Sequence, residues 1–134
     1  MDIFDASALL ALIKKERGYE EVKERLLLAK NENDSVFIHQ INFIEVTYHC
    51  LRKFGELKTG KLIAEFTPPE FGIVNYMDTD LALYTASLKA NYGLSFGDAS
   101  GLAFTRIMDG VFWTKDKALA PVAEKEGIKM KLLD

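Results

Sequence analysis

The sequence predicts a three-layer α/β/α fold, in which a central, mostly parallel sheet of about five short strands carries helices on both faces. Three observations predict it. Short apolar runs alternate along the chain with longer segments of helical period. Strands that are separated by helices favour parallel pairing, because each helix carries the chain back across the sheet. The third observation is size: 134 residues, 49% hydrophobic and 28% charged, without repeats or linkers, suit a single domain over residues 1–134.

The first half of the chain holds two predicted strands and four predicted helical segments. In order they are a strand at 3–4, helices at 6–17 and 19–30, a strand at 36–39, and helices at 42–54 and 57–66. Gly18 and Gly55 separate neighbouring helices, since glycine commonly ends a helix. Leu9, Leu10 and Ile13 form the buried stripe that we expect for the first helix.

The second half repeats the alternation and closes on a strand. The predicted elements are a strand at 71–74, helices at about 81–91 and 97–108, a strand at 111–113, a helix at 117–125 and a strand at 128–133. Asp78 or Asp80 caps the first of these helices, which turns Leu81 and Leu88, with Tyr84, inward. The last strand alternates apolar and charged residues, which places it at an edge of the sheet.

Composition limits the classes of protein that fit. The net charge of −3 argues mildly against a nucleic-acid binder, although basic residues cluster at 14–17, 52–53 and 115–117. No apolar stretch approaches the roughly 20 residues of a membrane span. Acids at positions 2 and 5 are unlike a secretory signal, and the single Cys50 excludes an internal disulfide. We therefore expect a cytoplasmic protein that contacts no membrane.

Four acids fall at or just beyond the ends of predicted strands. Asp5 and Asp116 follow strands directly, Asp98 opens a helix, and Glu45 lies one turn into the helix after the second strand. Because ligands of parallel α/β sheets bind beyond the carboxyl ends of the strands, these four side chains can converge there.

Each acid also has a simpler explanation. Asp5 and Asp116 are natural N-caps, and Ser95 with Asp98 fits a capping box. Glu45 borders an apolar stripe that we expect to be buried, formed by Ile41, Ile44, Tyr48 and Leu51. A carboxylate there needs a metal ion or a basic partner, unless it lies at the margin of the stripe and reaches water. The sequence leaves these two alternatives open.

Clustered carboxylates favour Mg²⁺ or Mn²⁺ over softer metals. The only other metal-binding residue types are His39, His49 and Cys50, and the last two are adjacent and face different directions on a helix. This geometry argues against a zinc site and does not allow a Cys–His nucleophile pair, and neither G-x-S-x-G nor a P-loop occurs. A magnesium ion held by carboxylates suits water activation and phosphate chemistry.

Four segments carry a resemblance to a known family: IFDASALLALI with Asp5 and Ser7, HQINFIEVTYH with Glu45, GLSFGDAS with Asp98, and WTKD with Thr114 and Asp116. In this order they resemble PIN-domain ribonucleases, in particular the VapC-type toxins of toxin–antitoxin pairs. The chain departs from the family pattern after Asp98, where Phe104, Thr105 and Arg106 replace small residues, and after Asp116, where Ala118-Leu119 replaces an aromatic residue.

The resemblance implies a ribonuclease that depends on Mg²⁺ or Mn²⁺. Asp5 and Asp98 would be the core ligands, Glu45 and Asp116 would bridge or act through water, and Ser7 and Thr114 would orient them. An RNA substrate, a cognate antitoxin and a homodimer would be the partners. Candidate phosphate contacts are Lys14, Lys15, Arg52, Lys115 and Lys117. Phe54, Phe66 and Phe71 could meet a partner, although the core is their expected place.

Two rival functions remain open from the sequence. The D-x-D pair in MDTD at 77–80 could mark another magnesium-dependent phosphotransfer enzyme, although capping is its more natural role. In the other rival the acids only cap helices, and the chain is a non-catalytic module that binds RNA or protein. Mutation of Asp98 in the presence and absence of a chelator separates both rivals from the nuclease.

Overall fold

A computed structural model describes all residues, 1–134, and contains one five-stranded sheet. Its strands are β1 (Asp2–Phe4), β2 (Val36–His39), β3 (Phe71–Val74), β4 (Val111–Thr114) and β5 (Lys129–Leu132). The strand order is β3-β2-β1-β4-β5, and every neighbouring pair is parallel. The predicted fold class is confirmed, and the sheet is wholly rather than mostly parallel. The last strand lies at an edge, as its alternating pattern predicts.

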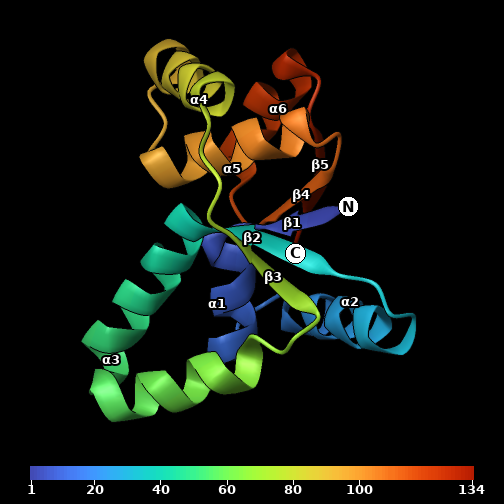
Figure 1. The fold of residues 1–134 in the computed structure, drawn as a ribbon, viewed down its shortest axis with the longest axis vertical. Helices are drawn as coiled ribbons and strands as arrows, with labels where there is room; N and C mark the ends of the chain where they lie inside the picture. The colour runs from blue at the N-terminus through green and yellow to red at the C-terminus, as the bar shows by residue number, and fades with distance from the viewer.

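Helices cover both faces of the sheet and give the three predicted layers. They are α1 (Ala6–Lys14), α2 (Tyr19–Asn31), α3 (Gln40–Phe66), α4 (Thr79–Tyr92), α5 (Phe96–Ile107) and α6 (Ala120–Glu126), with a short 3₁₀ helix at Lys117–Leu119. Figure 1 shows α1, α2 and α3 below the sheet and α4, α5 and α6 above it. The first helix is shorter than predicted, because Lys15 adopts a left-handed conformation and caps it.

Alternation along β1 feeds two cores, one on each face of the sheet. Phe4 points into the core shared with α1, α2 and α3, whereas Ile3 points into the core shared with α4, α5 and α6. Both side chains are fully buried, and each such burial contributes roughly 2–3 kcal/mol. Phe71 is buried in the first core, and Phe54 and Phe66 pack against it, so these three phenylalanines lie where we expected them.

Helix α3 contradicts the predicted buried stripe. Its buried face before Gly55 is Asn42, Val46 and Cys50, at a spacing of four residues. The expected stripe faces outward instead, with exposures of 60% for Ile44, 51% for Tyr48 and 42% for Leu51, and Ile41 is only half-buried. The prediction was wrong because it took the most apolar face to be the inner one, whereas the neighbouring chain requires a polar amide at position 42.

Gly55 divides α3 into two limbs. Its backbone has φ 78° and ψ 176°, which is non-helical, and the predicted break at this residue is confirmed. A Cβ at Gly55 would meet nothing within 4 Å, so backbone conformation rather than space requires glycine here.

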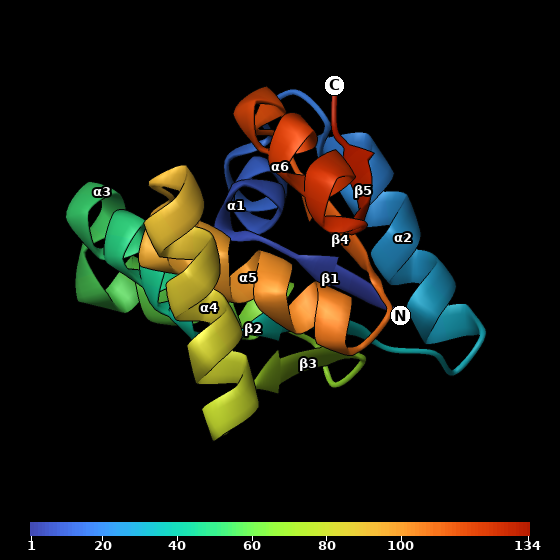
Figure 2. The ribbon, with the colours of Figure 1, turned by 90° about the horizontal axis from the view of Figure 1, so that it is seen from above.

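Helix α5 lies directly on the sheet, and α4 packs on the outside of α5 (Figure 2). Gly101 permits this approach, because a Cβ there would lie 2.7 Å from Phe112 Cε1 and 2.9 Å from Asn42 Nδ2. No helix has both the length and the apolar character required to cross a membrane.

Candidate active site

The centre of the sheet supplies the position for a site. From β1 the chain adds β2 and β3 on one side and β4 and β5 on the other, so the order reverses between β1 and β4. At such a switch point the loops beyond the carboxyl ends of the two strands separate and leave room for a ligand. Asp5 directly follows β1, and Thr114 is the last residue of β4.

Asp5 is buried, with an exposed fraction of 3%, and both of its carboxylate oxygens accept hydrogen bonds. Ser7 Oγ donates to Oδ1 at 2.6 Å, and the backbone N–H of Ala8 donates to the same oxygen at 2.9 Å. Thr114 Oγ1 donates to Oδ2 at 2.5 Å. The carboxylate therefore caps α1 and is also fixed to the neighbouring strand.

Ser7 and Thr114 continue this network toward the loop that carries Asp116. Ser7 Oγ accepts from the backbone N–H of Lys115 at 2.9 Å, and Thr114 Oγ1 accepts from the backbone N–H of Asp116 at 3.0 Å. Each hydroxyl donates to Asp5 and accepts from the loop after β4. These bonds fix the carboxylate of Asp5, and the role of Ser7 and Thr114 in orienting metal ligands stays a prediction.

The surroundings of Asp5 favour its protonated form. The pKa of Asp5 is raised to about 6: burial raises it most, the hydrogen bonds from Ser7, Thr114 and Ala8 lower it, and the nearby charge of Asp98 raises it. Three donors thus offset only part of the cost of desolvation. The site gains stability from any positive charge that comes to Asp5.

Asn42 is the residue of the site that the sequence analysis missed. It is 1% exposed; its Oδ1 accepts from the backbone N–H of Ala6 at 3.3 Å, and its Nδ2 donates to the carbonyl of Gly97 at 3.0 Å. One amide thereby joins the start of α1, the first limb of α3 and the start of α5. The sequence held one signal for it: Asn42, Val46 and Cys50 recur every four residues and therefore share one face of α3, which is the buried face.

Asp98 and Glu45 approach each other across the start of α5. A Cβ at Gly97 would lie 3.0 Å from Glu45 Oε2, so the missing side chain lets the glutamate reach the first turn of α5. Burial raises the pKa of Asp98, the hydrogen bond with Ser95 lowers it, and the charges of Asp116 and Glu45 raise it. Asp98 is therefore electrostatically coupled to three other acids, since Asp5 also responds to its charge.

We refer to Asp5, Glu45, Asp98 and Asp116 as the acidic centre. Two of the four cap helices: Asp5 accepts from the N–H of Ala8, and Asp116 Oδ1 accepts from the N–H of Ala118 at 3.0 Å. At α5 the cap is Ser95, whose Oγ accepts from the N–H of Asp98. Glu45 is half exposed and lies 3.9 Å from His49 Nε2. Of the two alternatives for Glu45, contact with water is the one observed, because the stripe beside it is not buried.

The donor set of the acidic centre suits a hard cation, although no group of three or more His, Cys, Asp or Glu side chains already forms a metal cage. The charge of Asp98 raises the pKa of Asp5, and the charges of Asp116 and Glu45 raise the pKa of Asp98. No basic group contributes to the pKa shift of Asp5 or Asp98. Carboxylates that repel one another without a compensating base fit a bound divalent ion.

The remaining metal-binding residue types have structural roles. His39 Nδ1 accepts from the N–H of Ile41 at the start of α3, and its Nε2 lies 2.9 Å from the carbonyl of Tyr76. Cys50 is buried in the first core. In the MDTD segment, Asp78 accepts from the N–H of Leu81 at 2.9 Å, so it caps α4 as the sequence indicated.

The predicted RNA-contacting residues are placed differently from one another. Lys14 and Lys115 both pair with Glu16, at 3.3 and 3.7 Å, and Arg52 Nη1 donates to the hydroxyl of Tyr48 at 2.8 Å. Lys117 is exposed at the start of the 3₁₀ helix. The lysine at position 15 caps α1.

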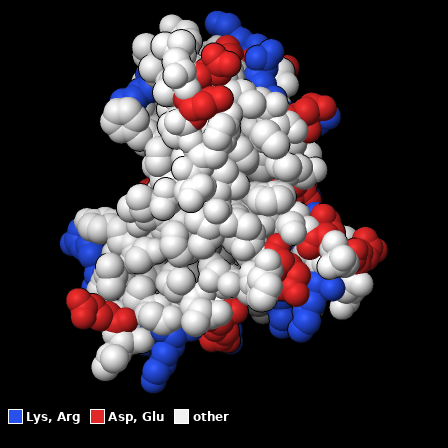
Figure 3. All heavy atoms as spheres, in the orientation of Figure 1, with Lys and Arg blue, Asp and Glu red and all other residues white.

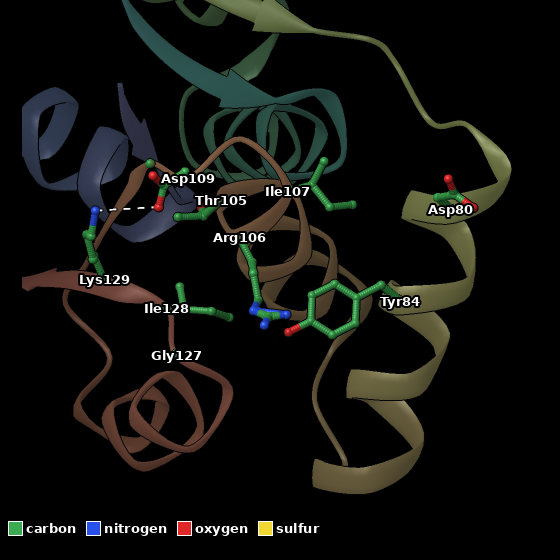
Figure 4. Close-up of a pocket in the computed structure, with 10 residues that line it drawn as sticks. Asp80, Tyr84, Thr105, Arg106, Ile107, Asp109, Gly127, Ile128 and Lys129 are labelled. Atoms are coloured by element: carbon green, nitrogen blue, oxygen red, sulfur yellow. Dashed lines mark hydrogen bonds and ion pairs between the residues drawn. The ribbon is translucent and has the colours of Figure 1, made fainter.

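A pocket of about 610 Å³ lies away from the acidic centre, at the amino ends of β4 and β5 (Figure 4). Tyr84 and Arg106 face each other in it, and Asp109 pairs with Lys129 at 3.4 Å. Tyr84 also donates to Glu126, which fixes α4 to α6. The charged residues that line this pocket are of both signs, and none of them belongs to the acidic centre.

The sequence and the fold of the chain were compared with those of known proteins. The family model described as PIN domain matches residues 3–125. Among solved structures, the chain is similar to VapBC2 from Rickettsia felis bound to a DNA fragment from their promoter, with 12% identity, a TM-score of 0.80, and coverage of 99% of this chain and 98% of that chain.

Two further solved structures are similar. The toxin–antitoxin complex from Klebsiella pneumoniae has 24% identity, a TM-score of 0.65 and coverage of 91% and 92% of this chain and that chain. VapC20 from Mycobacterium tuberculosis, a Sarcin-Ricin loop cleaving toxin, has 17% identity, a TM-score of 0.71 and coverage of 91% and 95%. At these identities the likeness shows the fold. Among curated proteins, no sequence matches the chain.

Proposed function

The chain belongs to the PIN domain family, and on this premise we propose that it is a metal-dependent endoribonuclease, the toxin of a toxin–antitoxin pair. The observation that carries the proposal is the acidic centre at the β1–β4 switch point, where the buried Asp5 and the half-buried Asp98 repel each other and no basic group contributes to the pKa shift of either. The similarity to VapC20, a toxin described as cleaving the Sarcin-Ricin loop, supports an RNA substrate.

In the proposed mechanism Asp5 and Asp98 would be the core ligands of Mg²⁺ or Mn²⁺, and Glu45 and Asp116 would help to hold the ion. A bound divalent ion supplies an activated water and neutralises charge on the phosphate. Ser7 and Thr114 keep both oxygens of Asp5 oriented through hydrogen bonds of 2.6 and 2.5 Å. Asn42 holds the start of α5 against α3, which keeps Asp98 and Glu45 at the same opening. Lys14, Lys15, Arg52, Lys115 and Lys117 remain candidate phosphate contacts.

The partners follow from the same proposal. The Rickettsia felis and Klebsiella pneumoniae structures contain toxin and antitoxin together, which supports a cognate antitoxin for this chain. We also propose a homodimer in the cytoplasm, where the unpaired, buried thiol of Cys50 stays reduced.

One observation favours a second candidate function. Asp5, Asp116 and the Ser95–Asp98 pair all complete helix caps, which is the whole role that a non-catalytic binding module requires of them. Such a module would bind RNA or protein without cleaving it. Another magnesium-dependent phosphotransfer enzyme has less support, because its D-x-D segment caps α4.

The test compares Asp98→Asn with Asp80→Asn, since both acids lie in the first turn of a helix but only Asp98 belongs to the acidic centre. We expect wild-type protein and Asp80→Asn to cleave transfer or ribosomal RNA with Mg²⁺ or Mn²⁺ and to stop on addition of EDTA. Asp98→Asn should lose roughly a hundredfold or more of the rate.

Melting with and without metal gives a reading independent of activity. A cation at 100 times its Kd stabilises the folded state by about 2.7 kcal/mol, so Mg²⁺ or Mn²⁺ should raise the Tm of wild type and Asp80→Asn, and less that of Asp98→Asn. Equal cleavage by all three proteins, insensitive to EDTA, would reject the nuclease assignment. Tight RNA binding by wild type without cleavage would support the module.

A further inference from the structure

Two adjoining pockets form a groove between α1 and α3, outside the acidic centre. One, of about 320 Å³, is lined by Leu10, Lys14, His49, Cys50, Arg52, Lys53 and Phe54. The other, of about 290 Å³, is lined by Ile13, Lys14, Lys15, Lys53, Phe54, Lys58 and Leu62. Lys14, Lys53 and Phe54 line both pockets, so the two are continuous. Figure 1 shows the two limbs of α3 spread around α1 at this place.

The groove is basic although the protein is acidic. Its lining includes five cationic side chains and no Asp or Glu: Lys14, Lys15, Arg52, Lys53 and Lys58. We call these five residues the basic groove. Figure 3 shows one face of the molecule, with uncharged atoms across its middle and charges of both signs at its margins. In a chain of net charge −3, five cations around one hollow make a local site for an anion.

One face of α3 connects the basic groove to the acidic centre. Glu45, His49 and Lys53 recur every four residues, so they lie in a row along the helix. Glu45 Oε1 lies 3.9 Å from His49 Nε2, and His49 in turn lines the first pocket. From Glu45 to Lys53 the helix rises by about 12 Å. A chain bound at the acidic centre can therefore enter the groove without leaving the surface of α3.

The kink at Gly55 brings the second limb of α3 to the same groove. Lys58, beyond the kink, has its Nζ 4.6 Å from the centre of the Phe54 ring, and Lys53, before it, has its Nζ 5.6 Å from that centre. The aromatic ring thus holds two ammonium groups from the two limbs near each other. A straight helix would carry position 58 more than one turn beyond position 53.

We infer that the basic groove binds the phosphate backbone of single-stranded RNA on its way to the acidic centre, an inference that rests on the proposed function. The groove is cationic along its length, has apolar side chains in its floor, and opens onto the acids through His49. RNA fits better than an acidic peptide because it is the one polyanion that must also reach the acidic centre. Lys53 and Lys58 become its central contacts, beside Lys14, Lys15 and Arg52.

The test uses charge reversal at matched positions of α3. Lys53→Glu and Lys58→Glu change the groove, whereas Lys61→Glu makes the same change of charge at an exposed lysine that lines neither pocket. Binding of a labelled single-stranded RNA is measured by fluorescence anisotropy in EDTA at several salt concentrations. We expect Lys53→Glu and Lys58→Glu each to weaken binding roughly tenfold and to reduce the slope of log K against log salt by about 0.7 per lost contact. Lys61→Glu should bind as wild type does.

The possible failures are distinguishable. If wild type cleaves RNA but all three variants bind it equally, the groove inference is wrong and the proposed function stands. If wild type neither binds nor cleaves RNA, both fail. If Lys53→Glu and Lys58→Glu keep their RNA affinity but lose affinity for a glutamate-rich peptide, the groove binds a protein partner and the RNA assignment is overturned. Two separate groove variants guard against a local folding defect at either one.

Discussion

The acidic centre and the basic groove are neighbours on α3, and they are built in opposite ways. Asp5 is 3% exposed, and three donors hold its two oxygens. The lysines and arginine of the groove lie near the surface, and their aromatic and ionic contacts are of the kind that contribute little to stability. Changes in the centre should therefore alter folding and chemistry together, whereas changes in the groove should alter binding alone.

The largest expected effect is a loss of stability when the carboxyl group of Asp5 in the acidic centre ionises. The pKa of Asp5 is about 6 in the folded protein against 3.8 as its ordinary value. Between these two values the unfolded chain has lost the proton while the folded chain keeps it. The contribution of Asp5 to the free energy of unfolding is therefore greatest below pH 3.8. It falls by about 3 kcal/mol as the pH rises from 3.8 to 6.

Urea unfolding of metal-free wild type and Asp5→Asn at pH 4, 5, 6 and 7 measures this effect. We expect the free energy of unfolding of Asp5→Asn to lack that decline and to exceed that of wild type at pH 7. The variant should also be inactive as a nuclease if Asp5 is the metal ligand that we propose. A decline that persists in Asp5→Asn would assign the titration to another acid.

A second prediction breaks the support of the centre rather than its charge. Asn42→Ala leaves the N–H of Ala6 and the carbonyl of Gly97 buried without their partner, which should cost about 2–4 kcal/mol. Thermal and urea unfolding measure the loss, and the rate of RNA cleavage should fall as Asp98 loses its fixed position. Asn91→Ala, at an exposed position of α4, serves as the control and should change little. Equal stability of the two variants would show that the amide does not hold α5 in place.

The smallest expected effect concerns the basic groove, where a change of charge should alter RNA binding and leave stability almost unchanged. Glu16 lies between Lys14 and Lys115, at 3.3 and 3.7 Å, and neutralises part of the charge available to RNA. Glu16→Gln should tighten RNA binding roughly two- to fivefold and change stability by less than about 1 kcal/mol. Anisotropy titration at low salt tests this, with Glu24→Gln on the exposed face of α2 as the control. Weaker binding by Glu16→Gln would place the RNA elsewhere.

Periodicity predicted the elements well and the orientation of one helix wrongly. The strands at 36–39 and 71–74 were predicted to the residue, because short apolar runs between turn residues have few alternatives. In α3 the apolar residues Ile44 and Tyr48 were assigned inward, but Asn42 is the inner residue. A helix with apolar residues on two faces leaves its rotation undetermined, and the hydrogen bonds to Ala6 and Gly97 decide it.

The positions of the acids in the fold were predictable from the sequence, whereas the basic groove was predicted only in part, through Lys14, Lys15 and Arg52. Asp5, Asp98 and Asp116 stand at element boundaries, where sequence places residues reliably in space. Lys53 and Lys58 meet only because Gly55 turns the chain and Phe54 lies between them. The closeness of these two lysines depends on the angle between the two limbs of α3, and the hydrophobic periodicity of the sequence does not predict that angle.

The pairing of β1 with β4 determines when during translation the site can exist. The hydrogen bond from Thr114 to Asp5 joins residues 109 positions apart. While a ribosome is still making the first hundred residues, the central strand lacks one neighbour and Asp5 lacks one of its three donors. Contacts of such long sequence separation form late. A growing chain therefore carries Asp5 before the hydrogen bonds that hold its carboxylate are complete.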